Sequence, residues 1–191
     1  MATLLIKKTH QHKSLKEVKF KDLWNLHGVF TTMRLIGKPT KILFFDEHIR
    51  NLIQSLNIYK IKTKNLKRTI IKLINLNLKN HNYSDHLLRV AVNKKIISIS
   101  IRKRPIPNKH FDLKLINYQR IDPTHKNLKY KKILSLIRKI DVKKMDIALY
   151  KNNKFLETGT SNLLFVKKNK LYSPKNNFYN GTTLKFLNKK I

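Results

Sequence analysis

Three groups of residues in this sequence could together do chemistry on an amine. Lys126 carries a primary amine, which becomes a nucleophile where a partly buried setting favours its neutral form. Glu157 lies 31 positions after Lys126 and opens the small-residue run Glu157-Thr158-Gly159-Thr160-Ser161-Asn162. Gly181-Thr182-Thr183 precedes an apolar stretch, which is typical of a helix start whose N–H groups bind phosphate. An amine, a carboxylate and a phosphate cradle are the groups that an enzyme with a phosphorylated aldehyde cofactor needs.

The order and spacing of these residues resemble the class IV pyridoxal-phosphate-dependent aminotransferases. That family includes branched-chain and D-amino-acid aminotransferases and 4-amino-4-deoxychorismate lyase. The string His125-Lys126-Asn127-Leu128-Lys129-Tyr130 is similar to the family's sequence around its Schiff-base lysine. The resemblance implies that Lys126 is the catalytic lysine, with Lys129 as its rival, and that Glu157 holds the pyridine nitrogen. It further implies that Tyr130, Thr182 and Thr183 bind the cofactor.

Two strings in the N-terminal half add to the resemblance. Gly28-Val29-Phe30-Thr31-Thr32-Met33-Arg34 is similar to the family's Gly-x-Phe-Glu-Thr-x-Arg strand, with Thr31 in place of the glutamate. His48-Ile49-Arg50-Asn51-Leu52 is similar to its His-x-x-Arg-Leu helix, in which the arginine binds the cofactor phosphate. Asn51 holds that position here, and Arg50 precedes it, so we expect Arg50 or Asn51 to take this role. Arg89 corresponds to a strand that often carries a substrate-binding arginine, although an outward strand cation is an equally good interpretation.

The resemblance implies transamination between an amino acid, with the branched-chain type favoured, and a 2-keto acid. A first alternative is 4-amino-4-deoxychorismate lyase activity that releases pyruvate, because it would use the same Lys126 and Glu157. A second alternative is an inactive relic of the fold or a basic nucleic-acid-binding protein. The family resemblance also implies a homodimer.

The expected fold class is α+β, with the two-domain architecture of the D-amino-acid aminotransferase-like enzymes. A basic, proline-containing break follows residue 101, so we expect a smaller N-terminal domain over 1–107 and a cofactor-binding domain over 108–191. Family members continue beyond their Gly-x-Thr motif, whereas this chain ends at Ile191, so we expect the C-terminal domain to be incomplete.

Hydrophobic periodicity and turn residues predict the elements that must position these groups. We expect Asp46 to cap a helix that contains Ile49, Leu52 and Leu56. The other predicted helices cover about 64–79, 125–140 and a short stretch after Gly181. The predicted strands cover 28–35, 40–45, 87–92, 96–101, 111–118, 145–150, 163–166 and the neighbourhood of 171.

Composition narrows the remaining classes. The chain has 191 residues and a formal net charge of +33, from 43 Lys and Arg against 10 Asp and Glu. The excess is mostly lysine, and Asn and Ile are also abundant, which indicates A/T-biased codons more than a polyanionic partner. Nucleic acid is therefore an unfavoured partner, although the charge does not exclude it. The chain has no cysteine, and no stretch is apolar and long enough to span a membrane, so we expect a cytoplasmic protein. His10 and His12 lack a third ligand, and no metal site is predicted.

Overall fold

The computed structural model of the chain describes residues 4–78 and 82–190. The chain divides into two compact units. The N-terminal unit comprises Met1–Arg104 together with Lys126–Leu128. The C-terminal unit comprises Pro105–His125 and Lys129–Ile191. The assignment of Lys126–Leu128 to the N-terminal unit matters for function, because this segment carries the candidate catalytic lysine.

The N-terminal unit is built on a six-stranded sheet in the order β2-β1-β6-β5-β3-β4. Each neighbouring pair is antiparallel. Apolar and polar residues alternate along the central strands, which is typical of a sheet with one face on the core. The strands are β1 (Leu4–Gln11), β2 (Glu17–Val18), β3 (Gly28–Ile36), β4 (Lys41–Ile42), β5 (His86–Asn93) and β6 (Ile96–Lys103).

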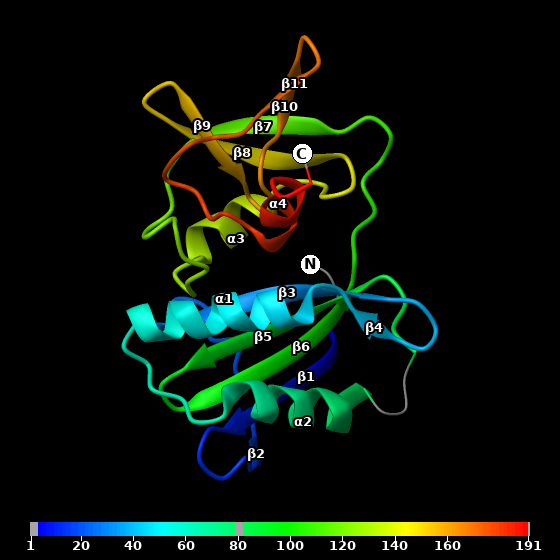
Figure 1. The fold of residues 1–191 in the computed structure, drawn as a ribbon, viewed down its shortest axis with the longest axis vertical. Helices are drawn as coiled ribbons and strands as arrows, with labels where there is room; N and C mark the ends of the chain where they lie inside the picture. Colours follow the sequence, from blue (N-terminus) through cyan, green and yellow to red (C-terminus); the bar gives the residue numbers. More distant parts are fainter. Residues whose placement is uncertain (1–3, 79–81, 191) are drawn as a thin grey trace. The chain divides into compact units, whose positions relative to one another are not determined.

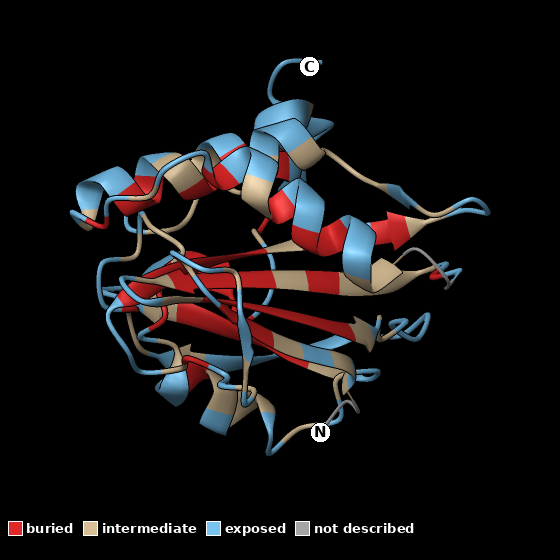
Figure 2. Ribbon diagram, turned by 90° about the horizontal axis from the view of Figure 1, so that it is seen from below, coloured by how far each residue is buried: buried red, intermediate tan, exposed pale blue. Residues whose placement is uncertain are grey.

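Two helices, α1 (Phe45–Ile58) and α2 (Leu66–Leu78), pack on this sheet (Figure 1). Their buried residues recur at helical spacing, for example Leu52 and Leu56 in α1 and Ile70 and Leu73 in α2. These side chains form one core with alternate residues of β3, β5 and β6, such as Met33. Figure 2 shows the result, with red, buried residues along the strands and helices that are red on one side and blue on the other.

The C-terminal unit contains a three-stranded sheet in the order β7-β8-β9. Strand β7 (Asp112–Asn117) runs parallel to β8 (Met145–Lys151), and β9 (Lys154–Thr158) returns antiparallel to β8. Helix α3 (Lys131–Ile137) connects β7 with β8 along the chain and contributes to the core of this unit. The unit also contains the hairpin β10 (Phe165–Lys167) with β11 (Lys170–Tyr172), and the short helix α4 (Thr182–Leu187).

The expected α+β content is present, and most predicted elements lie within a few residues of observed ones. One expected helix differs in a way that bears on function. The helix predicted over 125–140 was wrong in its first part, because α3 begins only at Lys131 and Asn127 forms an isolated β-bridge with Val29. The backbone of residues 126–128 hydrogen-bonds to β3 instead, so these groups do not close the i→i−4 bonds of a helix.

One further local expectation was wrong, and one strand was not predicted. Phe44, in the left-handed region with φ of 51°, precedes α1 as its N-cap residue, so the predicted cap Asp46 lies in the first turn and pairs with Lys67. Strand β1 was not predicted, because its sequence does not alternate regularly between apolar and polar residues. The two-domain boundary near residue 107 stays a proposal.

Candidate functional site

Lys126 lies beside the first residues of β3. The Phe30 N–H donates to the Lys126 carbonyl at 2.9 Å, and the Leu128 N–H donates to the Gly28 carbonyl at 2.9 Å. Gly28 is required at this crossing, since an added Cβ would lie 2.4 Å from the Val92 carbonyl oxygen and 2.7 Å from Leu128 Cδ1. The Gly-x-Phe string of β3 therefore positions the backbone of the candidate catalytic lysine.

The amine of Lys126 has an aromatic neighbour. Its Nζ lies 5.5 Å from the centroid of the buried Phe30 ring, within the usual range of a cation–π contact. Lys126 is half-buried, whereas its rival Lys129 is exposed. Partial burial disfavours the charged form of an amine, which is the condition for a lysine nucleophile. This difference favours Lys126 over Lys129.

His48 of α1 belongs to the same neighbourhood. Its Nδ1 lies 2.8 Å from the hydroxyl oxygen of the buried Thr31 on β3. Burial and, to a smaller extent, the charge of Lys126 lower the pKa of His48 from 6.5 to about 4. The imidazole is therefore neutral at physiological pH.

The other predicted residues of the N-terminal unit have distinct surroundings. Arg50 is exposed on α1, and Asn51 is half-buried, with its backbone carbonyl accepting a hydrogen bond from the Ser55 hydroxyl at 2.9 Å. Arg89 on β5 forms an ion pair with Asp22, and its guanidinium carbon lies 4.4 Å from the centroid of the Trp24 ring. Its Nε is buried without a hydrogen-bond partner among the residues that the structure describes. The Arg89 guanidinium therefore contacts both Asp22 and Trp24.

Glu157 lies in β9 of the C-terminal unit and is only 6% exposed. The Arg120 guanidinium donates from Nε to Oε1 at 2.6 Å and from Nη2 to Oε2 at 3.1 Å. The Tyr179 N–H donates to Oε2 at 3.4 Å. Burial alone would lower the pKa of Arg120, but the Glu157 carboxylate outweighs it and raises that pKa. A bidentate guanidinium contact of this kind favours the ionised carboxylate.

Tyr130 hydrogen-bonds to the turn that follows Glu157. The Tyr130 hydroxyl donates to the Gly159 carbonyl at 2.6 Å, and burial raises the pKa of Tyr130 well above its usual range. Gly159 fits here because an added Cβ would lie 2.7 Å from Ile147 Cγ1. Tyr130 therefore acts in this structure as a donor to the turn that follows Glu157.

Thr182 and Thr183 begin α4, and Gly181 precedes them with extended backbone. The Asn162 side chain fixes this approach, because its amide nitrogen donates to the Tyr179 carbonyl at 2.6 Å and its oxygen accepts from the Gly181 N–H at 3.0 Å. An added Cβ on Gly181 would lie 2.6 Å from the Asn162 oxygen. Thr182 is buried and Thr183 is exposed.

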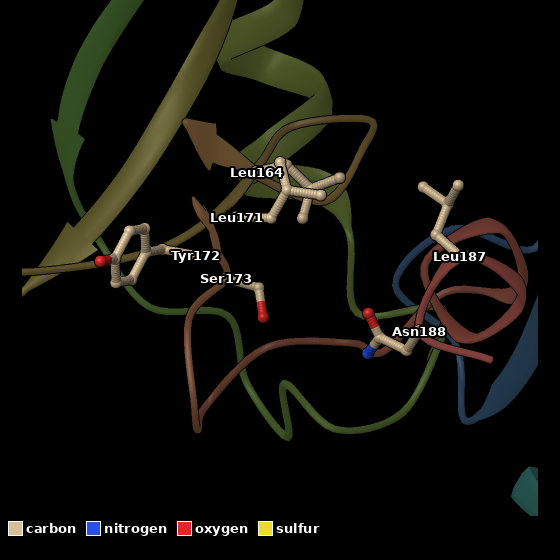
Figure 3. A pocket seen from close by; sticks show the side chains of 6 residues that line it. All are labelled: Leu164, Leu171, Tyr172, Ser173, Leu187 and Asn188. Carbon is tan, nitrogen blue, oxygen red and sulfur yellow. The ribbon is translucent and has the colours of Figure 1, made fainter. Parts of the chain in front are cut away.

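A separate pocket of about 200 Å³ lies in the C-terminal unit, beside β10, β11 and the end of α4 (Figure 3). None of its lining residues belongs to the sequence motifs. They are Leu164, Leu171, Tyr172, Ser173, Leu187 and Asn188. The pocket is therefore distinct from the residues singled out in the sequence.

The predicted residues thus fall into two sets. Lys126, Arg50 and Arg89 belong to the N-terminal unit, and Glu157, Tyr130, Thr182 and Thr183 belong to the C-terminal unit. Sequence reasoning missed Arg120, Asn162 and the Thr31–His48 pair as site residues. Arg120 had one available signal, because arginine is rare among the basic residues of this lysine-rich chain.

Comparison with known families gives one match. Residues 28–191 match the family described as amino-transferase class IV. The matched region contains the Gly28 string, the Lys126 segment, Glu157 and the start of α4. No curated protein sequence matches the chain.

Solved structures share the fold. A branched-chain amino acid aminotransferase from the organism abbreviated T.th., complexed with N-(5'-phosphopyridoxyl)-L-glutamate, has a TM-score of 0.75 and 13% identity over 98% of this chain and 73% of its own. A hypothetical aminotransferase from Mycobacterium tuberculosis in its PLP-bound form has a TM-score of 0.70 and 13% identity over 96% and 77%. A protein assigned as a 4-amino-4-deoxychorismate lyase from Legionella pneumophila has a TM-score of 0.67 and 19% identity over 86% and 68%. At these identities the likeness concerns the fold.

Within residues 4–78 and 82–190, no helix combines the length and the apolar character needed to cross a membrane. The same ranges contain no cluster of three or more His, Asp or Glu side chains arranged to hold a metal ion.

Proposed function

Because the chain belongs to the class IV aminotransferase family, as its motifs predicted, we propose that it is a pyridoxal-phosphate-dependent enzyme that transfers an amino group from an amino acid to a 2-keto acid. The branched-chain type of amino acid is favoured. The observation that carries the proposal is the buried Glu157, whose two carboxylate oxygens both accept hydrogen bonds from Arg120, in a chain where acids are scarce.

The residues of the chain fit this cofactor. Lys126 supplies a half-buried amine, Glu157 supplies a buried acceptor for a protonated ring nitrogen, and Thr182 with Thr183 supplies hydroxyls at a helix start. Gly181 allows the chain to pass close to the Asn162 side chain before that helix, since a Cβ at this position would collide with Asn162. When bound, pyridoxal phosphate supplies an electron sink for the charge that develops at the substrate's α-carbon.

Lys126 would hold the cofactor and then move a proton at the α-carbon of the substrate. Both tasks require a neutral amine, and the partial burial of Lys126 disfavours the charged form of its side chain. Lys129 is exposed and lacks this setting. The proposal therefore assigns the catalytic role to Lys126.

Glu157 would accept the hydrogen bond of the protonated pyridine nitrogen. A carboxylate can do so only while ionised, and Arg120 donates to both of its oxygens. Tyr130 supports the same strand end through Gly159. We propose Arg120 and Tyr130 as residues that hold Glu157 in place, and this refines the cofactor-binding role that the motifs implied for Tyr130.

Thr182 and Thr183 would bind the cofactor phosphate, with backbone N–H groups of the α4 start. Arg50 and Asn51 are the candidates in the N-terminal unit, and Arg89 is the candidate for the substrate carboxylate. A homodimer, which the family resemblance implies, and a cytoplasmic location, which fits a chain without cysteine, are further parts of the proposal.

The test of cofactor use is a borohydride experiment on the purified protein. With pyridoxal phosphate added, we expect a visible absorbance band, and after borohydride a covalent adduct that peptide mass spectrometry assigns to Lys126. Lys126→Ala should abolish the adduct, while Lys129→Ala should retain it. A colourless protein that takes up no cofactor in excess would overturn the proposal.

The test of the reaction is product analysis. We expect transfer of the amino group from leucine, isoleucine or valine to 2-ketoglutarate, with a new amino acid and a new keto acid in equal amounts. Lyase activity would instead release pyruvate from 4-amino-4-deoxychorismate without any keto-acid acceptor. That outcome would retain the roles of Lys126 and Glu157 and replace the proposed reaction.

A further inference from the structure

The Thr31–His48 pair beside Lys126 is the feature that the proposed function does not absorb. Thr31 is 3% exposed on β3, and its hydroxyl oxygen lies 2.8 Å from His48 Nδ1 on α1. The Phe30 N–H, one residue before Thr31, donates to the Lys126 carbonyl at 2.9 Å, and the charge of Lys126 contributes to the lowered pKa of His48. All three residues belong to the N-terminal unit, so their arrangement is a property of one compact body.

The hydrogen bond between Thr31 and His48 points to one tautomer of His48. A buried hydroxyl must donate its proton, and within the described residues the Thr31 hydroxyl meets His48 Nδ1 as its hydrogen-bond partner. If Thr31 donates, Nδ1 is the unprotonated nitrogen of the ring. The proton of the neutral imidazole then lies on Nε2, which is a hydrogen-bond donor.

Among the described residues, Lys126 is the charged group outside α1 that contributes to the lowered pKa of His48. On α1 itself, Asp46, Glu47 and Arg50 are all exposed. A carboxylate at position 31 would change this setting, because it would stabilise both a protonated imidazole and a protonated amine nearby. A threonine hydroxyl does neither.

We propose that Thr31 and His48 form a positioning pair for Lys126, in which the Thr31 hydroxyl holds His48 as a neutral Nε2–H donor and the lysine amine has a polar but uncharged neighbour. This arrangement favours the neutral amine that a nucleophile needs. The role in catalysis rests on the proposed function. The His48 tautomer and its hydrogen bond to Thr31 can be measured in the protein without cofactor.

The tautomer can be read by NMR of the protein without cofactor, with ¹⁵N-labelled histidine. In the parent protein we expect the Nδ1 shift of an unprotonated nitrogen and the Nε2 shift of a protonated one, with no change between pH 8 and pH 6. Thr31→Val, which keeps the shape and removes the hydroxyl, should mix the two tautomers. Thr31→Ser should restore the parent signals. A parent spectrum with protonated Nδ1, or a Thr31→Val spectrum identical to the parent, would overturn the proposal.

The effect on Lys126 can be read by acylation of the protein without cofactor, with the modified lysine resolved by mass spectrometry across pH 6–10. Thr31→Glu should slow labelling of Lys126 at pH 8 by about threefold or more, because a carboxylate stabilises the ammonium form. Thr31→Ser should label at the parent rate, and the exposed Lys129 in the same samples is the internal control. Equal Lys126 rates in Thr31→Glu and the parent would contradict the proposal.

These outcomes are distinct from those of the proposed function. A protein with the expected tautomer and labelling but no bound cofactor would remove the proposed function and leave the positioning pair intact. A protein that forms the Lys126 adduct but shows mixed tautomers would remove the positioning pair and leave the proposed function intact.

Discussion

Arg120 donates to both carboxylate oxygens of Glu157, at 2.6 and 3.1 Å, and both side chains are almost fully buried. The pair connects the segment that follows β7 with the end of β9, so it joins two parts of the C-terminal unit that are distant in sequence. A second contact of Arg120, from Nη2 to the Pro123 carbonyl at 2.7 Å, orders the loop before Lys126. One guanidinium therefore fixes both the acid and the loop.

Removing one member of this pair should destabilise the protein strongly. Arg120→Met leaves a buried carboxylate without its counter-ion, and we expect the free energy of unfolding to fall by about 3–5 kcal/mol. Urea denaturation at pH 7 measures this change. The double variant Arg120→Met with Glu157→Gln should recover part of the loss, and an Arg120→Met protein as stable as the parent would contradict the role of the pair.

Gly28→Ala should disturb the crossing between β3 and the Lys126 segment. The new Cβ would lie 2.4 Å from the Val92 carbonyl oxygen, which is backbone and cannot rotate away. We expect a loss of about 2 kcal/mol or more in unfolding free energy. Gly37→Asn is the matched control, since asparagine tolerates the φ of 76° at that turn and should change stability little.

His48 should make the stability of the protein fall in mild acid. The pKa of His48 is about 4 in the folded protein against 6.5 as the ordinary value, so below pH 6.5 the unfolded chain binds the extra proton first. Unfolding therefore becomes easier as pH falls from 6.5 to 4, by up to about 3 kcal/mol. His48→Gln should remove this part of the slope in denaturation curves taken at several pH values, and an unchanged slope would count against a buried, neutral His48.

Tyr130 should contribute at the alkaline end. Burial raises the pKa of Tyr130 above its ordinary value of 10.0, so the folded protein keeps the phenol proton that the unfolded chain loses. Its contribution is fully present below pH 10 and is lost as pH rises further. Tyr130→Phe should cost about 1 kcal/mol at pH 7 through the lost bond to Gly159. Its stability should also decline less steeply than that of the parent above pH 10, and equal slopes would contradict the prediction.

Asn162 should matter more for cofactor binding than for folding. Its side chain joins the Tyr179 carbonyl to the Gly181 N–H, so Asn162→Ala releases the approach to Thr182. Under the proposed function we expect the Kd for pyridoxal phosphate, measured by absorbance titration, to rise about tenfold. The exposed Asn176 offers a matched control, and equal affinities in Asn162→Ala and Asn176→Ala would show that this clamp is irrelevant to binding.

The sequence by itself determined the family, the α+β class and the approximate place of most elements. These features are local, because alternation, helical spacing and short motifs such as Gly28-x-Phe30 or Glu157-x-Gly159 are written in consecutive residues. The roles proposed for Lys126 and Glu157 also came from order along the chain, and they remain predictions.

Only the tertiary structure decided which side chains meet. Arg120 and Glu157, or Thr31 and His48, are pairs whose members lie in different elements, and no periodic pattern marks them. The same holds for residues 126–128, which follow a helix-like pattern in sequence but hydrogen-bond to β3. Hydrogen bonds and packing between distant segments outweigh local helix propensity, because that propensity differs by less than about 1 kcal/mol per residue between ordinary residues.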